Sequence, residues 1–190
     1  MTMLAIGAAT PSFSLESDAG ARVDAASLRG AWVVLYFYPK ADTPGCTREA
    51  QAFTAHLEAF RERGARVLGV SKDKAAALCK FREKYALEVE LLADPELTLH
   101  RAFGAFGEKV MYGKRVEGVL RSTFVLDPEG VVRHVFPSVK VDGHAEKVLE
   151  ALDELRGAAP KKAAAPKKAA APKKAAAPKK AAAPKKASRA

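Results

Sequence analysis

The sequence WVVLYFYPKADTPGC, residues 32–46, contains the signals that decide the fold. It begins with a continuous apolar run rich in β-branched and aromatic side chains, which is typical of a strand buried on both faces of a sheet. A proline ends this run. Thr43 is a favourable N-cap, and Pro44 suits the first position of a helix. The segment therefore predicts a central strand, a short turn and a helix whose first turn contains Cys46.

The flanking segments predict the remaining elements of an α/β domain. Alternating apolar residues before residue 25 predict an N-terminal β-hairpin. Apolar positions spaced by three and four predict helices over residues 44–64, 74–85 and 144–155, and a helical turn between residues 94 and 103. Apolar runs predict further strands at residues 67–70, 89–92, 122–126 and 131–136. This order of elements predicts a mixed sheet with helices on both faces, which matches a thioredoxin-like architecture.

The last part of the chain has a different composition. From Pro160 onward the sequence repeats PKKAAA, with ten lysines, Arg189 and no acidic residue. This segment carries +11, and the whole chain carries a formal net charge of +10, so residues 1–159 carry −1. The repeated prolines block helix propagation, and the repeat has no side chain that could build a core. We therefore expect a folded domain at residues 1–157 and a disordered basic tail at residues 158–190.

Hydropathy and cysteine count argue against several classes of protein. No run of about 18 apolar residues is present, so no membrane span is expected. The N-terminus lacks a basic segment followed by a long apolar one, which predicts no signal peptide and a cytoplasmic location. Cys46 and Cys79 are too few for a disulfide framework, and they stand in no metal-ligand spacing, so we expect no metal and no cofactor. The histidines are scattered at His56, His100, His134 and His144.

The predicted position of Cys46 suits a reactive thiol. The thiolate is the nucleophilic form, and an ordinary cysteine, with a pKa of about 8.5, is mostly protonated at neutral pH. In the first turn of a helix, free backbone N–H groups and the positive end of the helix dipole stabilise an anion. Thr43 stands three residues earlier, where its hydroxyl can reach the sulfur, and Arg121 is the candidate cation. Alternatively, Cys46 is a small core residue, since free cysteines are often buried.

The residues around Cys46 also resemble a known family. YFYPKADTPGCTREA, residues 36–50, is similar to the active-site stretch of the peroxiredoxins, whose signature is Pro-x-x-x-Thr/Ser-x-x-Cys. The segments GAATPSFSL, KVMYGKRVEGVLRSTFVLDPEG and VKVDGHAEKVLEAL agree with the subfamily called bacterioferritin comigratory protein or peroxiredoxin Q. The resemblance covers roughly residues 4–155.

This resemblance implies a thioredoxin-like fold with an N-terminal extension and a thiol-dependent peroxidase. It implies that Cys46 is the peroxidatic cysteine, which attacks the terminal oxygen of a hydroperoxide and becomes a sulfenic acid. It further implies that Thr43 hydrogen-bonds the peroxide and the thiolate, that Pro39 shields the pocket, and that Arg121 polarises the sulfur and the peroxide. A thiol must then reduce the sulfenic acid. The family suggests thioredoxin for this step and favours a monomer.

The chain departs from the subfamily at the resolving cysteine. Many members have a second cysteine five residues after the first, where this chain has Gln51. Cys79 lies on the second predicted helix, off its apolar stripe, and is expected to be partly exposed and to resolve the sulfenic acid. A disulfide needs Cα atoms within about 7 Å, so the first turn of the Cys46 helix would have to unwind. The alternative is a one-cysteine mechanism, in which an external thiol attacks the sulfenic acid. Glu49 and Lys40 could tune the pocket, although charges near a helix start are more often simply solvated.

The basic tail predicts binding to phosphate groups without recognition of bases. Its composition is similar to the tails of linker histones and bacterial histone-like proteins, and affinity for DNA should fall steeply with salt. One hypothesis is therefore a peroxidase tethered to the nucleoid. The alternatives are a low-complexity extension with no dedicated partner, and binding to anionic membrane surfaces or acidic proteins.

Two other functional classes fit the sequence less well. A thioredoxin-like disulfide oxidoreductase needs a Cys-x-x-Cys motif, and here Glu49 stands where the second cysteine would be. A nucleoid-associated structural protein with an incidental folded body would not need the Thr43–Cys46 motif or Arg121.

Overall fold

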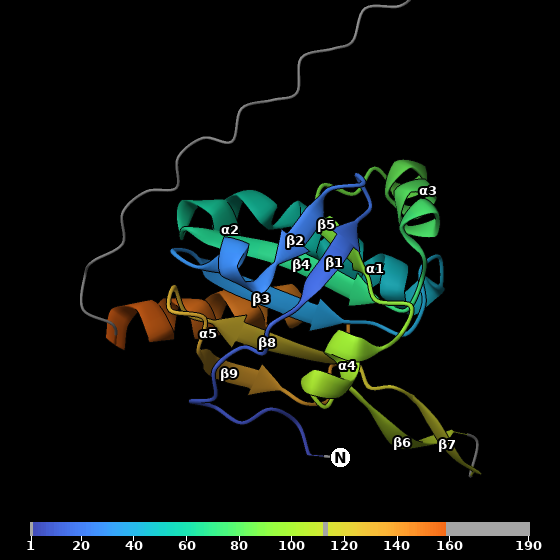
Figure 1. Ribbon diagram of the computed structural model, residues 1–190. Helices are drawn as coiled ribbons and strands as arrows, with labels where there is room; N and C mark the ends of the chain where they lie inside the picture. The colour runs from blue at the N-terminus through green and yellow to red at the C-terminus, as the bar shows by residue number, and fades with distance from the viewer. Residues whose placement is uncertain (1, 112–113, 159–190) are drawn as a thin grey trace, which may run out of the picture.

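The computed structural model describes residues 2–111 and 114–158, and within them the central element is a seven-stranded sheet (Figure 1). The strand order is β2-β1-β5-β4-β3-β8-β9. These strands are β1 (Ser14–Ser17), β2 (Arg22–Asp24), β3 (Trp32–Phe37), β4 (Ala65–Ser71), β5 (Glu90–Ala93), β8 (Ser122–Leu126) and β9 (Val132–Phe136). β3, β4 and β5 are parallel, whereas β8 runs antiparallel to β3. The predicted mixed sheet is confirmed.

Helices cover both faces of this sheet. They are α1 (Pro44–Ala55), α2 (Leu57–Glu62), α3 (Ala75–Tyr85), α4 (Thr98–Ala102) and α5 (His144–Ala158), with a 3-10 turn, η1 (Ala25–Leu28). Buried residues of α1, α2, α3 and α5 belong to one core, and those of η1 and α4 belong to the other. The chain is therefore a three-layer α/β domain, as the element order predicts.

The apolar run at residues 32–38 supplies both cores. All six residues of β3 are buried. Val34 and Tyr36 face the core under α1, whereas Val33 and Leu35 face the core under α4. Because side chains alternate along a strand, a strand covered on both faces has to be apolar throughout.

Three segments differ from the sequence prediction. The helix expected over residues 44–64 is divided at His56 into α1 and α2. The N-terminal hairpin is present, but β1 also pairs with β5, so it extends the central sheet and does not stand apart from it. A second hairpin, β6 (Phe106–Met111) with β7 (Lys114–Val119), projects from the body and is absent from the prediction (Figure 1).

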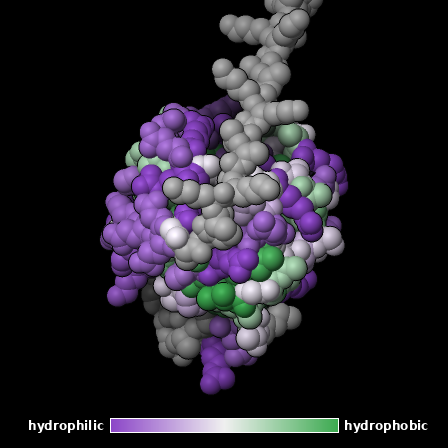
Figure 2. All heavy atoms as spheres, turned by 90° about the vertical axis from the view of Figure 1, so that its left-hand side faces the viewer, coloured by the Kyte–Doolittle hydropathy of each residue, from purple (hydrophilic) through white to green (hydrophobic). Residues whose placement is uncertain are grey.

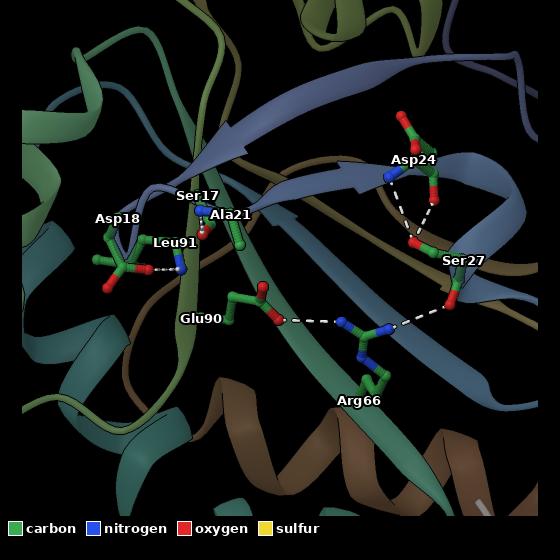
Figure 3. A network of polar contacts seen from close by, with 8 residues as sticks. All are labelled: Ser17, Asp18, Ala21, Asp24, Ser27, Arg66, Glu90 and Leu91. Atoms are coloured by element: carbon green, nitrogen blue, oxygen red, sulfur yellow. Dashed lines mark hydrogen bonds and ion pairs between the residues drawn. The ribbon is translucent and has the colours of Figure 1, made fainter. Parts of the chain in front are cut away.

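Polar contacts fix the sheet near the N-terminal hairpin (Figure 3). The Leu91 N–H donates to Asp18 Oδ1 at 2.9 Å. Arg66 on β4 donates to Glu90 Oε2 at 3.0 Å and to the Ser27 carbonyl at 3.2 Å. These hydrogen bonds connect the loop after β1 and the turn η1 to strands β4 and β5. Side-chain contacts therefore attach the edge of the sheet that β1 and β2 form.

The face at the end of α5 is mostly hydrophilic (Figure 2). α5 continues to Ala158, which is the first residue of the predicted tail, and the rest of that tail, residues 159–190, lies outside the described residues. In the described part of the chain, no helix combines the length and apolar character needed to cross a bilayer. The same residues contain no group of three or more His, Cys, Asp or Glu side chains placed to hold a metal ion.

Candidate active site

Cys46 lies in the first turn of α1, buried beneath the surface at 2% exposure. The helix starts here because Thr43 adopts the extended backbone of an N-cap and Pro44 follows it. The Thr47 N–H donates to the Thr43 carbonyl at 2.8 Å and closes the first turn. The earlier N–H groups of a helix have no intrahelical acceptor, so the sulfur sits where an anion is stabilised.

Arg121 brings a cation to this sulfur. Its Nη2 donates to Cys46 Sγ at 3.1 Å. The guanidinium crosses the first turn of α1 at Gly45, where an added Cβ would lie 3.5 Å from Nη2. Arg121 directly precedes β8, and β8 pairs with β3, so the sheet carries this distant residue to the helix start.

Glu49 holds the other side of the Arg121 guanidinium. Arg121 Nη1 donates to Glu49 Oε2, and the glutamate side chain is 1% exposed. Burial raises the pKa of Glu49 to about 7, although the arginine opposes this rise. The interpretation of Glu49 as a solvated charge is therefore wrong. Sequence reasoning missed its burial because its partner lies 72 residues away; Lys40 is exposed, as that interpretation expects.

Thr43 and Pro39 lie in the segment between β3 and α1, and no described hydrogen bond joins either residue to Cys46 Sγ. The Thr43 hydroxyl donates to the Lys40 carbonyl at 3.0 Å, and the Thr43 side chain makes no capping hydrogen bond to α1. Both Thr43 and Pro39 are partly exposed. A hydroxyl can rotate, so the Thr43 donor can leave the Lys40 carbonyl for another acceptor.

The loop before α1 is tied to the end of α3. Asp42 has a positive φ of 57°. Its carboxylate accepts hydrogen bonds from Lys84 Nζ at 2.9 Å and from Tyr85 Oη at 2.6 Å. We call these three residues the Asp42 latch. It joins the segment that leads into Cys46 to the helix that carries Cys79.

Cys79 occupies different surroundings. It is partly exposed on α3, as predicted, and its Sγ lies 3.8 Å from Glu83 Oε1. It lines a hollow of about 380 Å³ together with Asp18 and Arg82. Cys46 and Cys79 are both free cysteines.

Buried polar side chains lie beneath the Cys46 helix. Burial raises the pKa of Tyr36 well above its usual value, so this phenol stays neutral. Burial also lowers the pKa of His144 to about 4, and its Nε2 lies 2.8 Å from Thr123 Oγ1. Among the described residues, Arg121 is the cation that forms a hydrogen bond with Cys46 Sγ.

The described geometry therefore joins a buried thiol, a helix N-terminus and an arginine. The AhpC/TSA family matches residues 6–135 of the chain. The chain is 44% identical over 150 residues to Peroxiredoxin Bcp of Xanthomonas campestris pv. campestris, covering 79% of this chain and 94% of that protein. This chain belongs to the peroxiredoxins. Peroxiredoxin Bcp of Escherichia coli K12 is 38% identical to this peroxiredoxin over 154 residues, covering 81% of this chain and 99% of that protein.

Solved structures place this peroxiredoxin in the Bcp/PrxQ group. The bacterioferritin comigratory protein of Xanthomonas campestris has a TM-score of 0.72 at 43% identity, covering 75% of this chain and 91% of that chain. Peroxidoxin BcpB of Mycobacterium tuberculosis has a TM-score of 0.70 at 35% identity, covering 80% and 97%. The fold is thus the thioredoxin-like fold of these peroxidases, and the lysine-rich repeats lie outside the family match at residues 6–135.

Proposed function

We propose that Cys46 is the peroxidatic cysteine of this peroxiredoxin and reduces hydrogen peroxide and organic hydroperoxides, with a thiol such as thioredoxin as the reductant. One observation supports this role above all. Arg121 Nη2 donates to Cys46 Sγ at 3.1 Å, at the start of α1. A cation and a helix N-terminus both favour a thiolate, which is the form that attacks peroxide.

The reaction follows from this arrangement. The thiolate attacks the terminal oxygen of the peroxide, the S–O bond forms, and the O–O bond breaks. The other oxygen leaves with the bonding pair and gains a proton, giving water or an alcohol. Arg121 and the Cys46 backbone N–H stabilise the charge that develops on the oxygens, and the Thr43 hydroxyl turns from the Lys40 carbonyl to the bound peroxide. Cys46 is left as a sulfenic acid.

Cys79 is the candidate for the recycling step. We propose that Cys79 attacks the sulfenic acid on Cys46 and forms a disulfide with it, which thioredoxin or a similar thiol then reduces. Its partial exposure on α3 supports this role. Structures of the Xanthomonas campestris peroxiredoxin Q were solved with serine replacing one or the other of two cysteines. Because disulfide geometry is strict, the first turn of α1 must unwind before the bond forms.

Peroxide consumption by serine variants tests these assignments. In an assay with thioredoxin and its reductase, Cys46→Ser should abolish turnover because the nucleophile is gone. Cys79→Ser is the matched control and should keep the first reaction with peroxide while losing the intramolecular disulfide. Continued peroxide consumption by Cys46→Ser would refute the assignment. A Cys79→Ser variant that recycles at the full rate would favour the one-cysteine mechanism.

A second function concerns the basic repeats. We propose that residues 160–190 bind DNA non-specifically and hold this peroxidase at the nucleoid in the cytoplasm. Support comes from ten lysines and Arg189 with no acidic residue, beside a near-neutral remainder. Such a segment binds phosphate by releasing counterions, so its affinity depends steeply on salt.

Gel retardation compares the full chain with a variant in which the ten tail lysines are glutamine. The full chain should retard DNA of any sequence at low salt and release it as salt rises. The variant should not retard it. Equal binding of DNA by both proteins would contradict the proposal. Binding of the full chain to anionic vesicles but not to DNA would also contradict it, and would indicate a membrane surface as the partner of the tail.

A further inference from the structure

Two acidic groups share one arginine at the start of α1. Arg121 Nη2 donates to Cys46 Sγ at 3.1 Å, and its Nη1 donates to Glu49 Oε2. Both acidic side chains are almost fully buried, Cys46 at 2% and Glu49 at 1% exposure. A single guanidinium carries one positive charge, so a second anion at this position would be buried without a counter-ion.

The surroundings of Glu49 do not suit a permanent carboxylate. Its Oε1 is buried and has no hydrogen-bond partner among the described residues. An anionic oxygen without a donor is costly in a low-dielectric interior. The pKa of Glu49, raised to about 7 by burial, agrees with this geometry.

The other titratable groups around the arginine keep one charge state near neutral pH. Tyr36 on β3 faces Glu49 and Cys46 and stays neutral because its pKa is raised by burial. His144 on α5 faces Arg121 and is neutral above about pH 4, because burial lowers its pKa to about 4. Among the described residues, Cys46 and Glu49 are the two acidic side chains that accept hydrogen bonds from Arg121.

We propose that Cys46 and Glu49 share one proton across Arg121, with Cys46 as the thiolate and Glu49 as the carboxylic acid in the reduced enzyme. This inference rests on the proposed role of Cys46 in peroxide reduction. When Cys46 becomes a neutral sulfenic acid, Arg121 loses its anionic partner. Glu49 then ionises and replaces the thiolate as counter-ion.

The proton count balances for one turnover. Thiolate, carboxylic acid and ROOH give sulfenic acid, carboxylate and ROH. The sulfur gains an OH group, the O–O bond breaks, and the leaving RO⁻ gains a proton. Glu49 loses one proton at the same time, so the protein and substrate exchange no net proton with the solvent. Glu49 does not touch the peroxide in this account, and it acts as a positioning residue through Arg121.

Proton uptake during a single turnover tests the proposal. The full chain, with Cys79→Ser to stop the reaction at the sulfenic acid, is mixed with one equivalent of hydrogen peroxide at pH 7 in weak buffer containing a pH-indicator dye. Glu49→Gln keeps the shape of the side chain but has no proton to give. The Glu49→Gln protein should therefore take up one more proton from the solvent per oxidised Cys46 than the parent. The matched control is Glu108→Gln, an exposed glutamate at 68% side-chain exposure, which should behave like the parent.

Equal proton uptake by the parent and by Glu49→Gln would overturn the shared proton. Absence of a sulfenic acid on Cys46 in the parent would instead overturn the proposed peroxidatic role, so the two failures are distinguishable. If Glu49→Gln does not fold, infrared difference spectra of the parent decide the matter. Oxidation should remove a protonated carboxyl band, and no change in that region would contradict the proposal.

Discussion

The two cysteines lie in helices against the same core but meet opposite charges. Cys46 is buried in the first turn of α1 and accepts a hydrogen bond from Arg121 at 3.1 Å. Cys79 is partly exposed on α3, with a carboxylate oxygen of Glu83 at 3.8 Å. A nearby cation stabilises a thiolate and a nearby anion opposes it. The position in the fold, and not the cysteine side chain itself, therefore separates the proposed attacking thiol from the candidate resolving thiol.

Removing the cation should erase most of this difference. Arg121→Met combined with Glu49→Gln takes away the arginine without leaving a buried unpaired carboxylate. We expect the rate of Cys46 with peroxide to fall about 10²- to 10³-fold, as for the loss of one donor to a developing anion. Stopped-flow kinetics measures it, with Glu49→Gln alone as the control. A rate within about twofold of that control would show that Arg121 does not activate the sulfur.

The buried surroundings of the Cys46 helix also predict a pH dependence of the free energy of unfolding. Burial lowers the pKa of His144 to about 4 in the folded protein, from the ordinary histidine value of 6.5. The unfolded chain therefore binds this proton more tightly between these pH values. The free energy of unfolding should fall as pH drops through 6.5 and level off below about 4, with a total loss of about 3 kcal/mol.

Urea unfolding of the parent and of His144→Gln across pH isolates this contribution. The difference between the two curves removes the opposite contribution of Glu49, whose raised pKa costs stability as pH rises toward about 7. The parent should lose stability relative to the variant on acidification. Parallel curves would contradict the burial of a neutral histidine beside the Cys46 helix.

Removing the contact between the loop before α1 and helix α3 should have the smallest effect on the reactions of the two cysteines. The Asp42 latch joins the loop before α1 to α3 through Lys84 and Tyr85. Lys84→Met with Tyr85→Phe removes its donors, so the first turn of α1 should unwind more readily. We expect the Cys46–Cys79 disulfide to form a few-fold faster after oxidation, because exposed ion pairs contribute little.

Quenched-flow mass spectrometry measures this rate, with Lys80→Met on the same helix as the control. An unchanged rate of disulfide formation would mean that the latch does not limit the approach of the two cysteines.

The sequence predicted the sheet and the start of the Cys46 helix well because those signals are local. The apolar run at residues 32–38 and the Thr43-Pro44 helix start both depend on neighbouring residues. The burial of Glu49 depends on Arg121, far away in the sequence, so no periodicity could reveal it. The β6–β7 hairpin has charged residues along both strands, so apolar patterning could not mark it.

Mapping the first oxidised atom tests the central claim most directly. The reduced full chain is mixed with one equivalent of hydrogen peroxide in the presence of a sulfenic-acid trap, quenched at the earliest times and analysed by peptide mass spectrometry. The account predicts the trapped adduct on Cys46, with Cys79 still a free thiol. An adduct on Cys79 while Cys46 stays reduced would contradict it.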